Sequence, residues 1–159
     1  MPKKKVVFVL VEGPSDETAL APFFKILYDP NKVYVYVEGG DITSQKGVTS
    51  VNIINEVALR VKDYAKKHKI HNTDFERIIH IVDTDGTFIP EDKVKFDSCC
   101  QKTHYELECI KTANVNRILL RNRNKKNNVS KLVSVNHIWK IPYKVYYCLL
   151  YTSDAADEL

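Results

Sequence analysis

Carboxylates follow two apolar stretches of this sequence, and each time they stand close to a glycine. Glu12 ends the hydrophobic run of VFVLVEGPSDE, and Asp83 and Asp85 follow that of IIHIVDTDGTF. Carboxylates that converge without a partner repel one another and raise each other's pKa, and a divalent cation removes this conflict. Mg²⁺ prefers oxygen ligands and is commonly held by one or two carboxylates together with substrate phosphates. We therefore predict that Glu12, Asp83 and Asp85 are catalytic and bind Mg²⁺ or Mn²⁺.

A parallel α/β sheet would bring these carboxylates together. Three apolar, β-branched runs predict strands, at Lys5–Val11, Lys32–Glu38 and Phe75–Val82. Helical patterns separate them: the first contains Pro22, which predicts a kink or a restart, and the second covers Val51–Lys67. This alternating order is typical of a parallel sheet with right-handed crossovers and helices on both faces. Ligands bind such a sheet at the carboxyl ends of its strands, where the three acids lie.

Two more elements are predicted in the second half of the chain. A helix is expected within residues 111–133, with three apolar side chains facing inward: Val115, Ile118 and Leu119. The aromatic and β-branched run Tyr143–Tyr147 predicts a fourth strand.

The second half of the chain is also strongly basic. Between Cys109 and Ser153 there is no Asp or Glu but nine Lys and Arg residues, in a chain whose formal net charge is +4. The positive charges of such a segment repel one another unless the segment binds an anion, and a phosphate backbone is the usual anion. We therefore predict DNA or RNA as the partner, bound by Arg117, Arg121, Arg123, Lys125 and Lys126. A solvated basic face without any partner explains the same composition.

The end of the chain has an unusual sequence. CLLYTSDAADE, residues Cys148–Glu158, resembles the conceptual translation of a transposase-derived sequencing adaptor. The resemblance implies that the natural sequence is followed only to about Tyr147 and that its C-terminal part is missing. We therefore expect one domain over residues 1–147, with a basic insertion at about 89–143, and an adaptor-derived tail over residues 148–159.

The two acidic motifs together resemble those of a known family. VEGPSDE, followed about seventy residues later by VDTDG, is similar to the TOPRIM domain, which topoisomerases, bacterial primases and OLD-family (overcoming lysogenization defect) nucleases share. The resemblance covers roughly residues 4–88 and implies a Rossmann-like sheet of four parallel strands with helices on both faces. It places the family's glutamate on Glu12 and its DxD pair on Asp83 and Asp85. An acid on the helix after VEG most resembles the OLD-type nucleases, and it makes Asp16 or Glu17 a further metal ligand.

The function implied is metal-dependent hydrolysis of nucleic-acid phosphodiesters in the complete natural protein, with phage defence as a possible setting. A topoisomerase would also need a nucleophilic tyrosine on a separate domain, and a primase would usually bring a zinc module. An alternative is a HAD-like phosphatase or phosphotransferase, because DTDGT matches that family's signature, with Asp83 as nucleophile and Asp85 as acid/base. That signature normally opens its domain, and it leaves VEGPSDE unexplained. A third alternative is a non-catalytic nucleic-acid-binding module.

The cysteines and the start of the chain bear on location. The four cysteines lack a CxxC spacing, which favours free thiols in a reducing compartment. The first apolar run is too short to cross a membrane and no cleavage site follows it. We therefore expect a cytoplasmic protein without a membrane partner.

Overall fold

A mostly parallel five-stranded sheet forms the centre of the protein, in a computed structural model that describes residues 4–106 and 108–148. The strand order is β2-β1-β3-β8-β7. Four of the strands are mutually parallel: β1 (Lys5–Val11), β2 (Val33–Gly39), β3 (Phe75–Asp83) and β8 (Ile141–Cys148). The predicted α/β class with a mainly parallel sheet is thereby confirmed.

The fifth strand is the difference from the four strands expected. β7 (His137–Ile138) pairs antiparallel with β8 at the edge of the sheet. Trp139 and Lys140 join the two strands and both have positive φ, 52° and 63°. Two consecutive residues of this kind are what a tight hairpin turn requires, and Asn-Gly or Asp-Gly usually supplies them. Because neither stands here, the sequence does not signal the hairpin.

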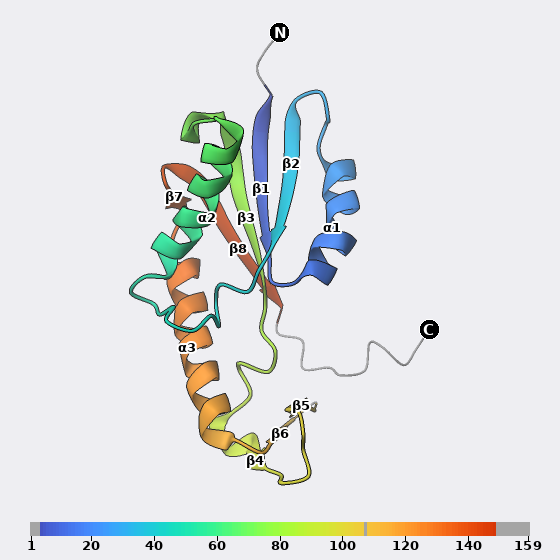
Figure 1. The fold of residues 1–159 in the computed structure, drawn as a ribbon, viewed down its shortest axis with the longest axis vertical. Helices are drawn as coiled ribbons and strands as arrows, with labels where there is room; N and C mark the ends of the chain where they lie inside the picture. Colours follow the sequence, from blue (N-terminus) through green and yellow to red (C-terminus); the bar gives the residue numbers. More distant parts are fainter. Residues whose placement is uncertain (1–3, 107, 149–159) are drawn as a thin grey trace.

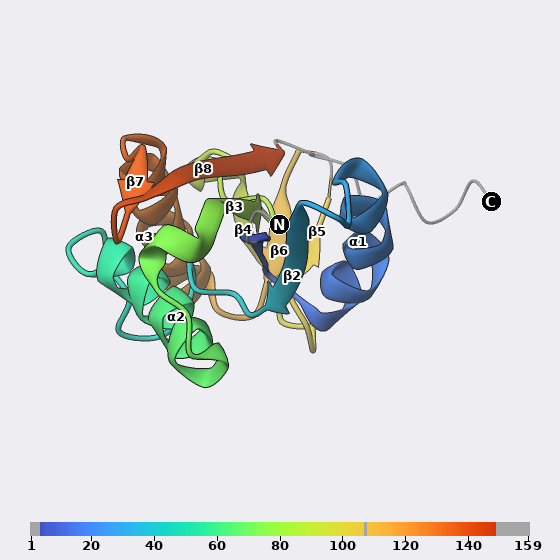
Figure 2. The same cartoon turned by 90° about the horizontal axis from the view of Figure 1, so that it is seen from above.

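Helices cover both faces of the sheet, as predicted (Figures 1 and 2). Helix α1 (Pro14–Leu27) lies on one face, and α2 (Ile53–His68) and α3 (Val115–Val133) lie on the other. Alternate side chains of β1 enter the two cores: Phe8 packs in the core of α2 and α3, and Val9 packs in the core of α1. Helix α1 runs on through Pro22 as one element rather than restarting there.

A second, smaller sheet lies beyond the carboxyl ends of the parallel strands (Figure 1). It has the order β4-β6-β5, formed by β4 (Val94–Phe96), β6 (Ile110–Thr112) and β5 (His104–Tyr105). Short 3₁₀ turns precede β3 and β4, at Asn72–Asp74 and Glu91–Lys93. The small sheet has its own core of Ile89, Val94, Ile110 and Ile118, against which Val115 and Leu119 pack.

Helix α3 belongs to both cores. Its first turns contribute Ile118 to the core of the small sheet, and its last turns contribute Val129 and Leu132 to the core of the main sheet. The helix therefore runs past the carboxyl edge of the main sheet, where the predicted acidic residues lie (Figure 1).

None of the helices within residues 4–106 and 108–148 is long and apolar enough to span a membrane. The predicted adaptor-derived tail lies outside the described residues, apart from Cys148 at the end of β8.

Candidate active site

The structure places the three predicted acids at the carboxyl edge of the sheet and links Glu12 to Asp85 through Lys125. Glu12 follows β1, Asp83 ends β3, and β1 and β3 are hydrogen-bonded neighbours. The ammonium Nζ of Lys125 lies 2.8 Å from Glu12 Oε2 and 3.6 Å from Asp85 Oδ2, so these two oxygens are separated by no more than the sum of the distances. Asp83 Oδ1 accepts the backbone N–H of Asp85 at 3.1 Å, which holds the DxD pair in a tight turn.

Two cationic side chains of the protein form ion pairs with these carboxylates. The Lys125 side chain is 0% exposed and donates to Glu12, whose side chain is 9% exposed. Arg121 Nη2 donates to Asp85 Oδ2 at 2.6 Å. Sequence reasoning assigned Lys125 and Arg121 to a nucleic-acid-binding face, whereas the structure puts Lys125 inside the acidic site and pairs Arg121 with Asp85. The expected repulsion is thus already relieved by a buried ammonium and a half-buried guanidinium.

Helical spacing explains why Lys125 is buried. The side chains that α3 buries recur every three or four residues and so share one face of the helix: Ile118, Asn122, Lys125, Asn128, Val129 and Leu132. In the sequence, Lys125 falls on the stripe marked by Ile118, Val129 and Leu132. That position was the available sign that this lysine points into the protein.

The loop after β2 adds two residues that sequence reasoning missed. Thr43 Oγ1 lies 2.8 Å from Glu12 Oε1 and 3.0 Å from Asp41 Oδ1, and its single proton can serve only one of them at a time. Asp41 also accepts the Ser44 N–H at 3.0 Å. Asn128, fully buried on α3, donates to the Thr43 carbonyl at 2.8 Å and anchors the loop. The signal was Asp41 beside a glycine pair at the end of a strand, the pattern also seen at Glu12 and Gly13.

Burial and hydrogen bonding set the protonation of the four acids. Burial raises the pKa of Glu12 to about 7, against the opposing charge of Lys125. Burial and a hydrogen bond to Asp85 raise the pKa of Asp83. The pKa values of Asp85 and Asp41 are lowered, although burial alone would raise them. For Asp85, the hydrogen bond from Asp83 and the charge of Lys125 outweigh burial. For Asp41, the hydrogen bonds from Ser44 and the charge of Lys125 do so. Among these acids, Glu12 therefore has the pKa closest to neutral pH.

Asp16, the additional predicted metal ligand, caps helix α1. Its Oδ2 accepts the Gly13 N–H at 3.0 Å. Asp16 and Asp83 line one shallow cavity of about 420 Å³, together with Leu20 and Tyr146. The neighbouring Glu17 instead accepts the Gly39 N–H at 3.2 Å.

The other predicted basic residues of α3 are exposed. Arg117 lies on the first turns of the helix. Arg123 forms a two-pronged pair with Glu91, with both N···O distances at 2.6 Å. Lys126 Nζ lies over the Phe88 ring, 5.9 Å from its centroid. All three side chains lie at the surface of α3, and Arg123 is already paired with Glu91.

Comparison of the chain with protein-family models, with curated proteins and with solved structures gives no match. The functional argument therefore rests on the geometry of the acidic site and of α3.

A raised pKa for Glu12 predicts a specific pH dependence of stability. The folded protein retains a proton on Glu12 up to about pH 7, whereas the unfolded chain releases it near 4.5. The contribution of Glu12 to the free energy of unfolding should therefore be greatest below pH 4.5 and fall by about 3 kcal/mol as the pH rises to 7. Urea unfolding of wild type and Glu12→Gln at pH 4.5, 6 and 7.5 measures this, since the glutamine variant lacks the dependence. Parallel curves for the two proteins would contradict the assignment.

Proposed function

We propose that this chain carries the catalytic site of a metal-dependent nuclease of the TOPRIM type, similar to the OLD nucleases, which uses Mg²⁺ or Mn²⁺. The observation that supports the proposal is that Glu12, Asp83 and Asp85 all lie at the carboxyl edge of a parallel sheet, with Glu12 and Asp85 both paired to Lys125 of the basic helix α3. Acidic side chains supply metal ligands and a proton acceptor there, and basic side chains supply contacts for a phosphate backbone.

The donor set suits a hard cation. The carboxylates at this edge of the sheet offer oxygen atoms as ligands. Asp83 is exposed, and it lines one cavity together with Asp16. Within residues 4–106 and 108–148, no three Asp, Glu, His or Cys side chains are grouped to hold an ion. Mg²⁺ is often bound by only one or two carboxylates, with water and substrate phosphate completing its shell. Asp83 and Asp85 would hold the ion, which when bound neutralises phosphate charge and lowers the pKa of coordinated water.

Glu12 would accept a proton and return it during the reaction. A carboxyl with a pKa of about 7 can both accept and return a proton near neutral pH. Lys125 fixes one of its oxygens. The other is covered by the Thr43 hydroxyl, which can turn to Asp41, 3.0 Å away, and so free Glu12 Oε1. Lys125 in this arrangement positions Glu12 rather than contacting nucleic acid at the surface.

A HAD-like phosphotransferase is the second candidate. The observation that favours it is that Asp83 is exposed at the end of the central strand β3. The backbone N–H of Asp85, two residues further on, donates to its carboxylate. In that mechanism Asp83 attacks a phosphomonoester and Glu12 has no role. Glu12→Gln therefore separates the two enzymes: it should impair phosphodiester cleavage and leave a HAD-like phosphatase active.

Nuclease activity has a direct test. End-labelled single- and double-stranded DNA and RNA are incubated with the chain and Mg²⁺ or Mn²⁺, and p-nitrophenyl phosphate serves as the phosphomonoester. We expect metal-dependent cleavage of nucleic acid that EDTA stops, and a higher melting temperature in the presence of the metal. Nucleic-acid binding without cleavage, and without any metal effect on melting, would overturn the nuclease and favour the non-catalytic binding module.

The exposed residues of α3 predict salt-dependent binding to nucleic acid. Each phosphate contact contributes about 0.9 to the slope of log K against log salt on duplex DNA. Reversing Arg117, Arg123 and Lys126 to Glu should therefore lower the slope by about 3. Fluorescence anisotropy across a salt series measures it. The matched control reverses Lys66, Lys67 and Lys69, which lie at the far end of α2, and an equal effect from both sets would assign the basic residues to general charge.

A further inference from the structure

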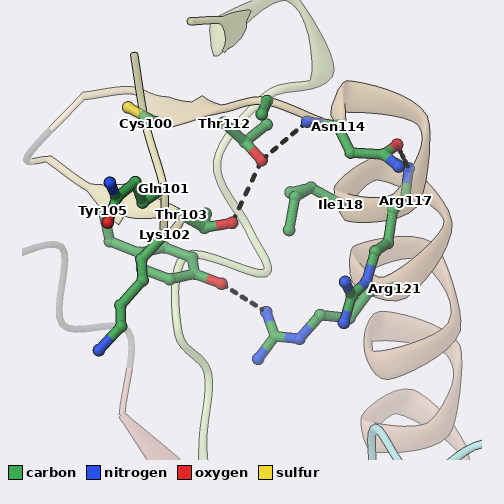
Figure 3. A pocket seen from close by; sticks show the side chains of 11 residues that line it. Cys100, Gln101, Lys102, Thr103, Tyr105, Thr112, Asn114, Arg117, Ile118 and Arg121 are labelled. Atoms are coloured by element: carbon green, nitrogen blue, oxygen red, sulfur yellow. Dashed lines mark hydrogen bonds between the residues drawn. The ribbon is translucent and has the colours of Figure 1, made fainter. Parts of the chain in front are cut away.

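A cavity of about 410 Å³ lies between the small sheet and the first turns of α3 (Figure 3). Its walls include Lys102, Tyr105, Asn114, Arg117 and Arg121. Arg121 also donates to Asp85, so this side chain belongs both to the cavity and to the candidate active site. The volume falls in the range of about 300–1,000 Å³ that small-molecule sites occupy.

The lining of the cavity is cationic. It contains Lys102, Arg117 and Arg121 and no acidic side chain. Arg117 and Arg121 are four residues apart on one helix face, where like charges repel. Arg121 is paired with Asp85, but the Arg117 guanidinium forms no ion pair with any residue that the structure describes. An anion held between the two arginines would remove this repulsion, and phosphate is the anion whose geometry suits paired guanidinium groups.

An aromatic ring faces these arginines. Tyr105 lies across the cavity from α3, and Arg121 Nη1 donates to its hydroxyl at 3.2 Å, as Figure 3 shows. The Arg121 guanidinium carbon lies 6.0 Å from the ring centroid. Aromatic side chains beside cationic grooves are the surfaces on which single-stranded nucleic acids stack their bases. Phosphate-binding and base-stacking groups thus line one cavity.

We propose that this cavity binds one nucleotide of the nucleic-acid substrate, with its phosphate between Arg117 and Arg121 and its base against Tyr105, and that this binding draws Arg121 away from Asp85. The proposal rests on the proposed nuclease function and deepens it. Arg121 Nη2 now holds Asp85 Oδ2 at 2.6 Å, an oxygen that a metal ion would need. A phosphate competing for the guanidinium removes this 2.6 Å bond and leaves Lys125 Nζ, 3.6 Å away, as the remaining cation beside that oxygen. Substrate binding therefore raises the affinity for the metal, and by linkage the metal raises the affinity for the nucleotide equally.

The test uses thymidine 3′,5′-bisphosphate, which contains both phosphate and base but no phosphodiester that the proposed activity would cleave. Its binding is measured by calorimetry, and Mn²⁺ binding is measured from the electron paramagnetic resonance signal of free Mn²⁺, corrected by a protein-free titration. The bisphosphate should raise the Mn²⁺ affinity of wild type about tenfold, and Arg117→Ala should weaken bisphosphate binding at least about tenfold. Lys131→Ala, which removes an exposed cation from the far end of the same helix, should change neither.

The variant Arg121→Met distinguishes two explanations for a higher Mn²⁺ affinity. In one, Arg121 releases Asp85; in the other, the metal ion simply binds the phosphate of the bisphosphate. With the Arg121 bond to Asp85 already removed, this variant should bind Mn²⁺ about tenfold more tightly than wild type without the bisphosphate and gain little when it is added. A variant that retains the full wild-type gain would overturn the release of Asp85. Bisphosphate binding that is absent at millimolar concentration, or unchanged in Arg117→Ala, would overturn the nucleotide site.

The outcomes also distinguish this inference from the proposed function. If Mn²⁺ binds and the bisphosphate does not, the nucleotide site is wrong and the nuclease proposal stands. If Mn²⁺ binds under no condition, the metal-dependent function and its coupling are both wrong. Bisphosphate binding that depends on Arg117 would then support the nucleotide site alone.

Discussion

Lys125→Met should lower the free energy of unfolding by about 4 kcal/mol at pH 8.5, and by much less at pH 5. The substitution keeps an unbranched side chain, shorter by the terminal ammonium nitrogen, and removes the only fully buried charge among the described residues of α3. Glu12 then loses its 2.8 Å partner while remaining almost buried. At pH 8.5 it must either stay ionised without a counter-charge or take up a proton at a cost, whereas at pH 5 it is already protonated.

Urea unfolding at the two pH values measures this effect. Lys126→Met is the matched control, because it makes the same chemical change at the neighbouring exposed position and should stay within about 0.5 kcal/mol of wild type. Adding Glu12→Gln to Lys125→Met should restore much of the stability at pH 8.5, since no unpaired charge is left. Equal losses at both pH values would mean that the lysine stabilises by packing alone.

Asp83→Asn should reduce metal-dependent cleavage on the order of 10³-fold and leave the melting temperature unchanged. Asp83 is exposed at the end of β3, and its Oδ1 accepts the backbone N–H of Asp85, a bond that the asparagine Oδ1 can also accept. Asp83 makes no ion pair with Lys125 or Arg121, so stability should not depend on its charge. Metal binding does depend on it, because an amide is a much poorer ligand than a carboxylate.

The comparison is made on kcat/KM for the nucleic-acid substrate, with thermal unfolding in parallel. Asp63→Asn, an exposed position on α2, is the matched control and should retain full activity. An Asp83→Asn variant that cleaves normally would remove Asp83 from the active site. Loss of phosphomonoester turnover in this variant, together with an active Glu12→Gln variant, would favour the HAD-like reaction.

Much of the main sheet could be predicted because its strands are buried on both faces. The run Lys5–Val11 coincides with β1, and Phe75–Val82 is β3 without its last residue, Asp83. Parallel strands end at one edge, so Glu12 was expected near the aspartates if the first and third strands are neighbours, and β1 and β3 are neighbours in the structure. The antiparallel hairpin of β7 could not be predicted, because its turn residues Trp139 and Lys140 are not residue types that usually adopt positive φ.

The contacts within the acidic site were harder to predict. Charge counting treated Lys125 as one of many surface cations, but its position on the buried stripe of α3 gives it a single partner, Glu12. Thr43 reaches Glu12 through a loop without periodicity, held in place by Asn128 from 85 residues further along the chain. The burial of Lys125 could be read from its place on the apolar stripe of α3, but its partner and the contact of Thr43 depend on tertiary packing.

Helix α3 has a mechanical consequence because it is embedded in two cores at once. Its first turns are fixed to the small sheet by Ile118, and its last turns to the main sheet by Leu132, with the carboxylate-binding side chains between them. A rigid rod held at both ends transmits a tilt at one end to everything along its length. A displacement of the small sheet should therefore also move Lys125 and Arg121, which α3 carries between its two cores.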